Sequence, residues 1–138
     1  MTAFGGLSIL NPMGVTVTMS AEAPWSTPRL PDGLTADQIA RAAQVRRQGI
    51  AEGAGGFFAS RVVMPAGLVT DPHHHDHSEL IVVLDGSMEF DGGGGPVVLA
   101  EHDSAVIEAG QVYGFTVGDD GVEFLLVRTA LTTSRLAT

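Results

Sequence analysis

Short runs of hydrophobic residues, several of them alternating with polar ones, fill most of the chain after residue 56. Glycine, proline and aspartate separate these runs, and their regular spacing indicates an all-β sandwich or barrel. Strands are expected at residues 57–65, 80–84, 87–90, 97–100, 105–107, 112–117 and 122–129. Tight turns are expected at Asp85–Gly86, across the glycines of 91–95 and at 118–121.

The N-terminal part of the chain is more mixed. One or two edge strands are expected between Leu7 and Met19, broken at Asn11–Pro12. Residues 21–33 contain three prolines and predict a loop. Trp25, the only tryptophan, lies in this loop. It either pins the loop to the barrel or a second subunit, or covers the barrel mouth.

Thr35–Gln48 is the one segment with convincing helical periodicity. Thr35 and Gln38 have the spacing of a capping box, and the glycines from Gly49 onward end the helix. Its arginines at 41, 46 and 47 fall largely on the polar side. The apolar stripe, at residues 39, 42, 43 and 45, is expected to pack against the barrel.

Length and composition narrow the class of protein. We expect one domain over 138 residues, with N-terminal strands, loop and helix in 1–55 and the barrel in 56–130. The absence of cysteine excludes disulfides and thiolate sites, so any metal must bind nitrogen and oxygen. A net charge of −9 argues against nucleic acid binding. No apolar run reaches the ~20 residues of a membrane span, and no signal peptide is apparent, so a cytoplasmic protein is expected.

Four of the five histidines lie at residues 73–77, close to Glu79. In an extended strand His73, His75, His77 and Glu79 share one face, and His74 points to the other. Imidazoles and a carboxylate suit divalent iron, manganese, nickel, cobalt or zinc, and two histidines with one carboxylate leave coordination positions open. The alternative is a solvated loop of histidines without a metal.

The spacing of this segment matches a family motif. Gly67, five residues, His73-x-His75, three residues, Glu79, six residues and Gly86 correspond to the first cupin motif at every defining position. The chain therefore resembles a small single-domain cupin, which implies a double-stranded β-helix, or jelly-roll barrel. The resemblance implies that His73, His75 and Glu79 bind one divalent metal ion inside it, with iron favoured over manganese, nickel, zinc or cobalt. It also implies a homodimer.

His77 has three possible roles. It can bind the metal if the strand bulges, move a proton, or hold a hydrogen bond without taking part in catalysis. His74 is expected outside the site.

The second cupin motif departs from the family pattern. Gly110 is kept, but Glu108 replaces a proline, and Tyr113 stands where a fourth ligand, a histidine, is expected. Tyr113 could ligate as a phenolate, act beside the metal as a hydrogen-bond donor or base, leave a three-residue site with an open position, or simply pack in the barrel. His102 falls in a turn and is expected at the surface.

Apolar side chains are expected to line the barrel and to form a site for a small organic molecule. Trp25 and Phe115 are candidate substrate contacts. The candidate lining residues are Val62, Met64, Ile81, Val83, Phe90, Val106, Phe115, Phe124 and Leu126.

These features, with the resemblance, favour a metal-dependent enzyme acting on a small organic substrate. The first expectation is a dioxygenase-like oxidoreductase with a mononuclear centre, in which His77 and Tyr113 are the catalytic residues. Redox-neutral isomerase, cyclase or lyase chemistry is the alternative, because cupins cover all of these activities. A metal-bearing binding module without turnover, or a metal-free sugar-binding or structural cupin, remains as a further alternative.

Overall fold

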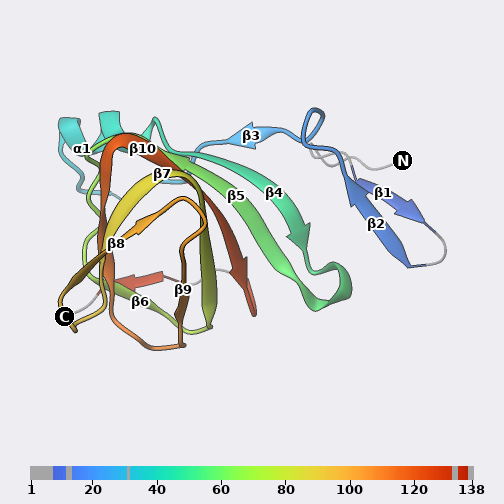
Figure 1. The fold of residues 1–138 in the computed structure, drawn as a ribbon. Helices are drawn as coiled ribbons and strands as arrows, with labels where there is room; N and C mark the ends of the chain where they lie inside the picture. The colour runs from blue at the N-terminus through green and yellow to red at the C-terminus, as the bar shows by residue number, and fades with distance from the viewer. Residues whose placement is uncertain (1–7, 12–13, 31, 132–133, 137–138) are drawn as a thin grey trace.

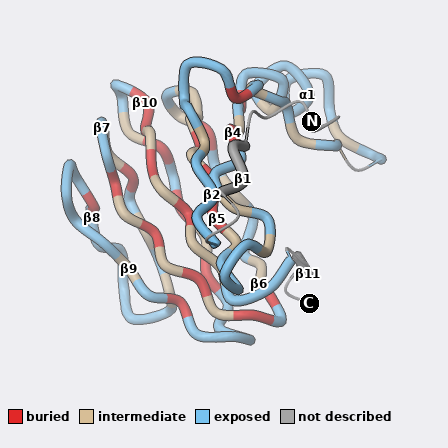
Figure 2. The backbone as a smooth tube through the Cα atoms, turned by 90° about the vertical axis from the view of Figure 1, so that its right-hand side faces the viewer, coloured by how far each residue is buried: buried red, intermediate tan, exposed pale blue. Residues whose placement is uncertain are grey.

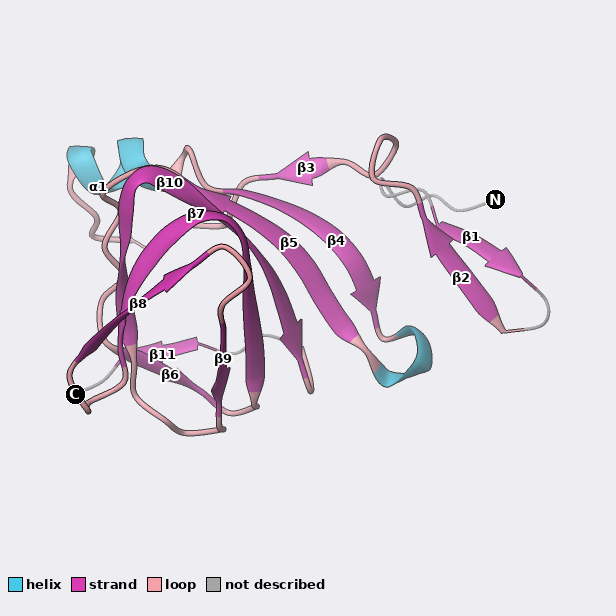
Figure 3. Cartoon of the chain, viewed as in Figure 1, coloured by secondary structure: helices cyan, strands magenta, loops and turns pink. Residues whose placement is uncertain are grey.

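Antiparallel strands make up most of the protein in the computed structural model, which describes residues 8–11, 14–30, 32–131 and 134–136 (Figure 3). One α-helix and one short 3-10 helix complete the described elements, α1 (Ala36–Ala42) and η1 (Ala54–Gly56). The strands are β1 (Ser8–Asn11), β2 (Val15–Thr18), β3 (Trp25–Ser26), β4 (Arg46–Glu52), β5 (Phe58–Met64), β6 (His73–His75), β7 (Glu79–Asp91), β8 (Pro96–Ala100), β9 (Ser104–Ile107), β10 (Gly114–Arg128) and β11 (Ser134–Leu136).

Two long strands, β7 and β10, organise the barrel (Figure 1). The seven-stranded sheet has the order β3-β4-β5-β10-β7-β8, and β9 pairs with the first half of β7 while β8 pairs with its second half. The small β6–β11 sheet joins the start of β10 through a bridge between His73 and Tyr113. The strands thus curl over one another as a jelly roll, which confirms the predicted all-β fold.

The turns predicted at Asp85–Gly86 and at 118–121 are wrong. Both segments lie inside continuous strands, β7 and β10, where four residues of β10 lie opposite Ser87 alone. Gly86 has φ +76°, and a Cβ atom there would lie 2.1 Å from the carbonyl oxygen of Gly121. A glycine is therefore needed for the close approach of two bulged strands, a local signal that resembles a turn.

Buried and more exposed residues alternate along β5, β7 and β10, so one face of these strands forms the hydrophobic core inside the barrel (Figure 2). Eight of the nine predicted lining residues are buried or packed against the core. Val106 is the exception at 72% exposed, because it lies opposite Leu80, whereas its neighbour Ile107 lies opposite the buried Glu79. The inner face of β9 is therefore offset by one residue from the prediction.

The helix is shorter than predicted. Thr35 and Gln38 form the expected capping box, but α1 ends at Ala42 and residues 46–52 form β4 instead. The long-range ladder between β4 and β5 overrides local helix propensity here. The helix buries none of its residues, and Arg41 Nη1 ties it to the barrel by donating to the carbonyl oxygen of Gly67 at 2.8 Å.

The predicted N-terminal edge strands are present as a separate hairpin of β1 and β2, which extends away from the barrel in Figure 1. The expected break at Asn11–Pro12 reaches beyond the described residues, since Pro12 is outside them. The loop that follows contains the two-residue strand β3, which pairs Trp25 with Gln48. The buried Gln48 side chain donates to the carbonyl oxygens of Ser20 and Ala23 at 2.7 and 3.1 Å, so it holds this loop on the outer face of the sheet.

Candidate metal centre

Three buried side chains gather their donor atoms at one place inside the barrel. One potential ligand atom from each of His75, His77 and Glu79 lies within 4.8 Å of the others. Their exposed fractions are 8%, 6% and 3%, and His75 Nε2 lies 3.3 Å from Glu79 Oε1. Two imidazoles and a carboxylate in this arrangement form a candidate site for a divalent metal ion.

His77 lies in a bend between β6 and β7. Strand β6 ends at His75, which pairs with Ser134, and β7 begins only at Glu79. The residues between them form a bend, and His77 keeps the inward direction that alternation predicts for it. The rings of His75 and His77 stack with centroids 5.2 Å apart and planes inclined by 9°.

His77 supplies the observation that tests whether the site fits a metal. Both of its ring nitrogens are buried, and neither has a hydrogen-bond partner among the described residues. Burying a polar nitrogen without a partner is costly, and a neutral imidazole offers one lone pair to a cation. The donor set and the unpartnered ring both fit a divalent ion.

His73 lies at the edge of the group rather than within it. Its ring centroid is 5.0 Å from that of His75, and its Nδ1 donates to the carbonyl oxygen of Asp71 at 2.8 Å. That hydrogen bond leaves Nε2 with the lone pair, as in many metal-binding histidines. Burial lowers the pKa of His73, although the Asp71 hydrogen bond acts in the opposite direction. The gathered set therefore differs from the predicted ligands in containing His77 in place of His73, and a ligand role for His73 stays a prediction.

Tyr113, the residue just before β10, lies beside the same group of donor atoms. Its backbone exchanges two hydrogen bonds with His73, both 2.9 Å long, and its hydroxyl donates to Glu79 Oε1 at 2.7 Å. The ring packs against Phe90 with centroids 5.2 Å apart. Burial, the nearby charge of Glu79 and this hydrogen bond all raise the pKa of Tyr113. In this structure the hydroxyl is thus a hydrogen-bond donor to Glu79, and a role for Tyr113 as a metal ligand stays a prediction.

Other candidate residues are spread differently. Trp25 stacks over the Arg61 guanidinium, 5.0 Å away, on the outer face of the sheet, so the structure does not bring it to the histidines. Phe115 is buried two residues beyond Tyr113 and packs edge-on against Phe124. His102 is at the surface, as predicted.

His74, expected outside the group, is half-buried and lies opposite Arg135 of β11.

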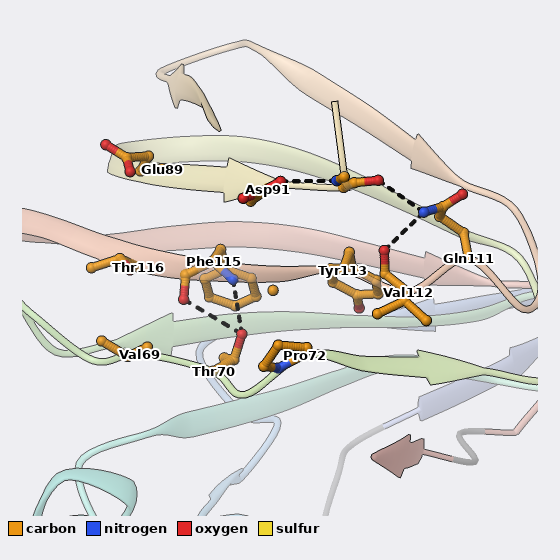
Figure 4. A pocket seen from close by; sticks show the side chains of 13 residues that line it. Val69, Thr70, Pro72, Glu89, Asp91, Gln111, Val112, Tyr113, Phe115 and Thr116 are labelled. Atoms are coloured by element: carbon orange, nitrogen blue, oxygen red, sulfur yellow. Dashed lines mark hydrogen bonds between the residues drawn. The ribbon is translucent and has the colours of Figure 1, made fainter. Parts of the chain in front are cut away.

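A hollow of about 470 Å³ lies along the start of β10 (Figure 4). Tyr113 and Phe115 line it together with Thr70 and Asp91. The Gln111 amide closes one side by donating to the carbonyl oxygens of Gly92 and Val112 at 2.9 and 2.8 Å. Tyr113 thus takes part both in this hollow and, through its hydroxyl, in the donor group.

Two arginines face the same interior, and sequence reasoning missed both. Arg128 lies opposite Glu79 in the β10–β7 ladder, and Arg47 lies opposite the fully buried Val62 in the β4–β5 ladder. Directly opposed residues share a face, so both side chains start from the inner face. Burial lowers the pKa of each arginine, and Glu79 is the main charge that opposes this shift for Arg47.

Family comparison agrees with the geometry. Residues 60–128 match the cupin domain, a stretch that covers half of the chain and contains the donor group. The chain is a cupin. No functionally curated protein matches it significantly in sequence.

Solved structures of the same fold are similar over most of this cupin. The polyketide cyclase RemF from Streptomyces resistomycificus aligns with TM-score 0.68 and 19% identity, over 87% of this chain and 83% of its own. KdgF from Halomonas sp. aligns with TM-score 0.62 and 19% identity, over 80% and 88%. The DMSP lyase DddQ from Ruegeria pomeroyi DSS-3 aligns with TM-score 0.69 and 24% identity, over 85% of this chain and 62% of its own. At these identities the likeness establishes the fold only.

Within the described residues, no helix has both the length and the apolar character that crossing a membrane requires.

Proposed function

We propose that this cupin is a metal-dependent enzyme that carries out redox-neutral acid–base chemistry, of the lyase, cyclase or isomerase kind, on a small organic substrate. The observation that carries the proposal is the hydrogen bond from the buried Tyr113 hydroxyl to Glu79, beside the two histidines. It places a protonated group that can exchange a proton next to a site able to bind a metal ion.

His75, His77 and Glu79 would hold the ion, with His73, two residues before His75 on β6, as an additional ligand. A divalent ion bound there supplies a Lewis acid that polarises a substrate oxygen. Iron, manganese, nickel, cobalt and zinc all accept such donors.

The chain's own residues would then manage the proton. The Tyr113 hydroxyl hydrogen is directed at Glu79 Oε1 and can turn to a substrate atom that develops negative charge. The Tyr113 ring is held between Phe90 and His73, so its oxygen stays in one position. The buried apolar residues that surround the group exclude water from this exchange.

Two of the similar structures support redox-neutral chemistry by name, since one is a lyase and one is a polyketide cyclase. The second candidate is a dioxygenase-like oxidoreductase, which the pair of histidines with one carboxylate favours.

The experiment begins with metal content. Protein purified without a histidine tag is supplied with iron, manganese, nickel or zinc, and bound metal is measured before and after His77→Ala. We expect the wild-type protein to bind about one metal ion per chain and His77→Ala to lose it. A wild-type protein that binds none of these ions contradicts the proposal.

Turnover of a panel of small hydroxy acids, enols and diketones is then followed together with oxygen consumption. Turnover without oxygen uptake is the expected result, and Tyr113→Phe should reduce it even at a metal concentration that saturates the variant. Oxygen uptake coupled to turnover selects the dioxygenase instead. Metal binding without turnover of any compound in the panel favours a binding module and counts against the enzyme.

A further inference from the structure

One row of inner-face residues crosses the barrel at its rim. Glu52 lies opposite Phe58, Phe58 opposite Arg128, and Arg128 opposite Glu79. Glu52 and Arg128 end their strands, and Phe58 and Glu79 begin theirs, so the row lies at the lower end of the barrel in Figure 1. Because all four residues stand at strand ends, the row lies at one end of the barrel rather than in its middle.

Arg128 forms no ion pair with Glu79, the acidic residue opposite it in this row, among the described residues. Its Nε and Nη1 atoms are buried and have no hydrogen-bond partner within the described chain. The Glu79 carboxylate is instead directed to the Tyr113 hydroxyl and His75. Unpaired buried guanidinium nitrogens are costly, so a further acceptor is expected for them.

The Ser60 hydroxyl and the Arg47 side chain start from the same inner face. Ser60 Oγ is buried without a partner, two residues along β5 from Phe58. Arg47 reaches this face from β4, and its charge is close enough to Arg128 to lower the pKa of Arg128 further. Two like charges held near each other favour an anion between them or beside them.

The charge balance points the same way. Arg47 and Arg128 are offset by Glu79 and the exposed Glu52, which are the charges that act on them. A divalent ion bound by His75, His77 and Glu79 would add two positive charges to a balanced set. An anionic ligand would neutralise this excess and would at the same time supply acceptors for Arg128.

We propose that the substrate of this cupin carries a carboxylate, which Arg128 binds with help from Arg47, while a second oxygen of the same molecule faces the metal donor group. This inference rests on the proposed function and narrows its substrate class to small oxygen-bearing carboxylic acids. Arg128 acts as the anion anchor because its buried Nε and Nη1 have no acceptor in the described chain, and a guanidinium donates charge-assisted hydrogen bonds to a carboxylate.

A matched pair of probes tests the charge alone. Lactate and lactamide have nearly the same shape, but only lactate is an anion. Each is titrated into the 138-residue protein with and without Mn²⁺, and binding is followed by calorimetry. We expect lactate to bind at least about tenfold more tightly than lactamide in both states, and more tightly with Mn²⁺ than without it.

Arginine variants test the anchor. Arg128→Gln should lower lactate affinity about tenfold, to the level of lactamide, and Arg47→Gln should lower it less. Arg46→Gln is the control, because Arg46 is exposed on the same strand as Arg47 and points to the opposite face. Arg128→Lys keeps the charge and should retain part of the lactate preference, which shows that the loss in Arg128→Gln is not a folding defect.

Three results would overturn the inference: equal binding of lactate and lactamide, unchanged lactate affinity in Arg128→Gln, or no lactate binding up to about 50 mM, well above the range that charged hydrogen bonds give. Failure to bind Mn²⁺ would instead count against the proposed function. In that case the metal-free titrations still decide whether the arginines form an anion site.

Discussion

Replacing Tyr113 by phenylalanine isolates one hydrogen bond at the centre of the site. The ring would keep its packing against Phe90 and His73, so only the hydroxyl that donates to Glu79 at 2.7 Å is lost. Both groups are buried, with exposed fractions of 4% for Tyr113 and 3% for Glu79. The variant therefore creates no cavity and leaves a carboxylate with one partner fewer.

The magnitude follows from the kind of bond. A hydrogen bond to a charged group contributes about 1.5–3 kcal/mol, and Glu79 keeps its contact with His75 at 3.3 Å. We therefore expect the free energy of unfolding of the metal-free protein to fall by about 2 kcal/mol, or roughly 5–10 °C in Tm. Because groups that hydrogen-bond to metal ligands also orient them, Mn²⁺ affinity should fall about tenfold.

Urea denaturation and Mn²⁺ titration measure the two effects separately. Thr70→Val is the matched control, because it removes the neutral hydrogen bond that the Phe115 amide donates to Thr70 Oγ1 at 2.9 Å, without touching Glu79. The control should lose about 1 kcal/mol of stability and no metal affinity. If Tyr113→Phe matched the wild type in both measurements, the hydroxyl would not be engaged with Glu79 and the reasoning would be refuted.

Three further sets of variants test the rest of the structure. His77→Ala should lower Mn²⁺ affinity at least about a hundredfold and His73→Ala by about tenfold or less, as measured by equilibrium dialysis; the reverse order would restore the ligand set predicted from the sequence. Gly86→Ala should destabilise the protein by more than about 3 kcal/mol in urea, because its Cβ would meet a backbone oxygen, whereas Gly94→Ala, with open space around it, should be nearly neutral. Gln48→Leu should cost about 1–3 kcal/mol by leaving the carbonyl group of the buried Ala23 without its donor, and a change below about 0.5 kcal/mol would show that the N-terminal loop does not depend on it.

Local patterns predicted the fold well where contacts are local or strictly periodic. Alternation located the barrel strands, and the capping box located the start of the helix. The end of the helix was not predictable in this way, because residues 46–52 become a strand through pairing with β5, a contact distant in sequence. Gly86 shows a second limit, since a bulge and a turn both call for a glycine with positive φ.

In the candidate site, too, sequence spacing predicted some neighbours, whereas other features depend on the folded chain. Motif spacing predicted that His75 and Glu79 would lie together, and they do. The motif does not include His77, although alternation had placed it on the same face as His75 and Glu79, and the structure brings the three together. The unpartnered ring of His77 could only be recognised once the surrounding chain was in place.

The two inward-facing arginines, Arg128 and Arg47, differ in how far the sequence could predict their direction. Arg128 follows Phe124 and Leu126 at every second position, so its inward direction was available from the sequence, whereas Arg47 had been assigned to a helix that ends before it. What no pattern could indicate is that Glu79 is already engaged by Tyr113, which leaves Arg128 unpaired. Buried guanidinium nitrogens without acceptors, beside a group able to bind a metal ion, favour a negatively charged ligand. The engagement of Glu79 by Tyr113 is therefore the contact on which the proposed carboxylate substrate depends.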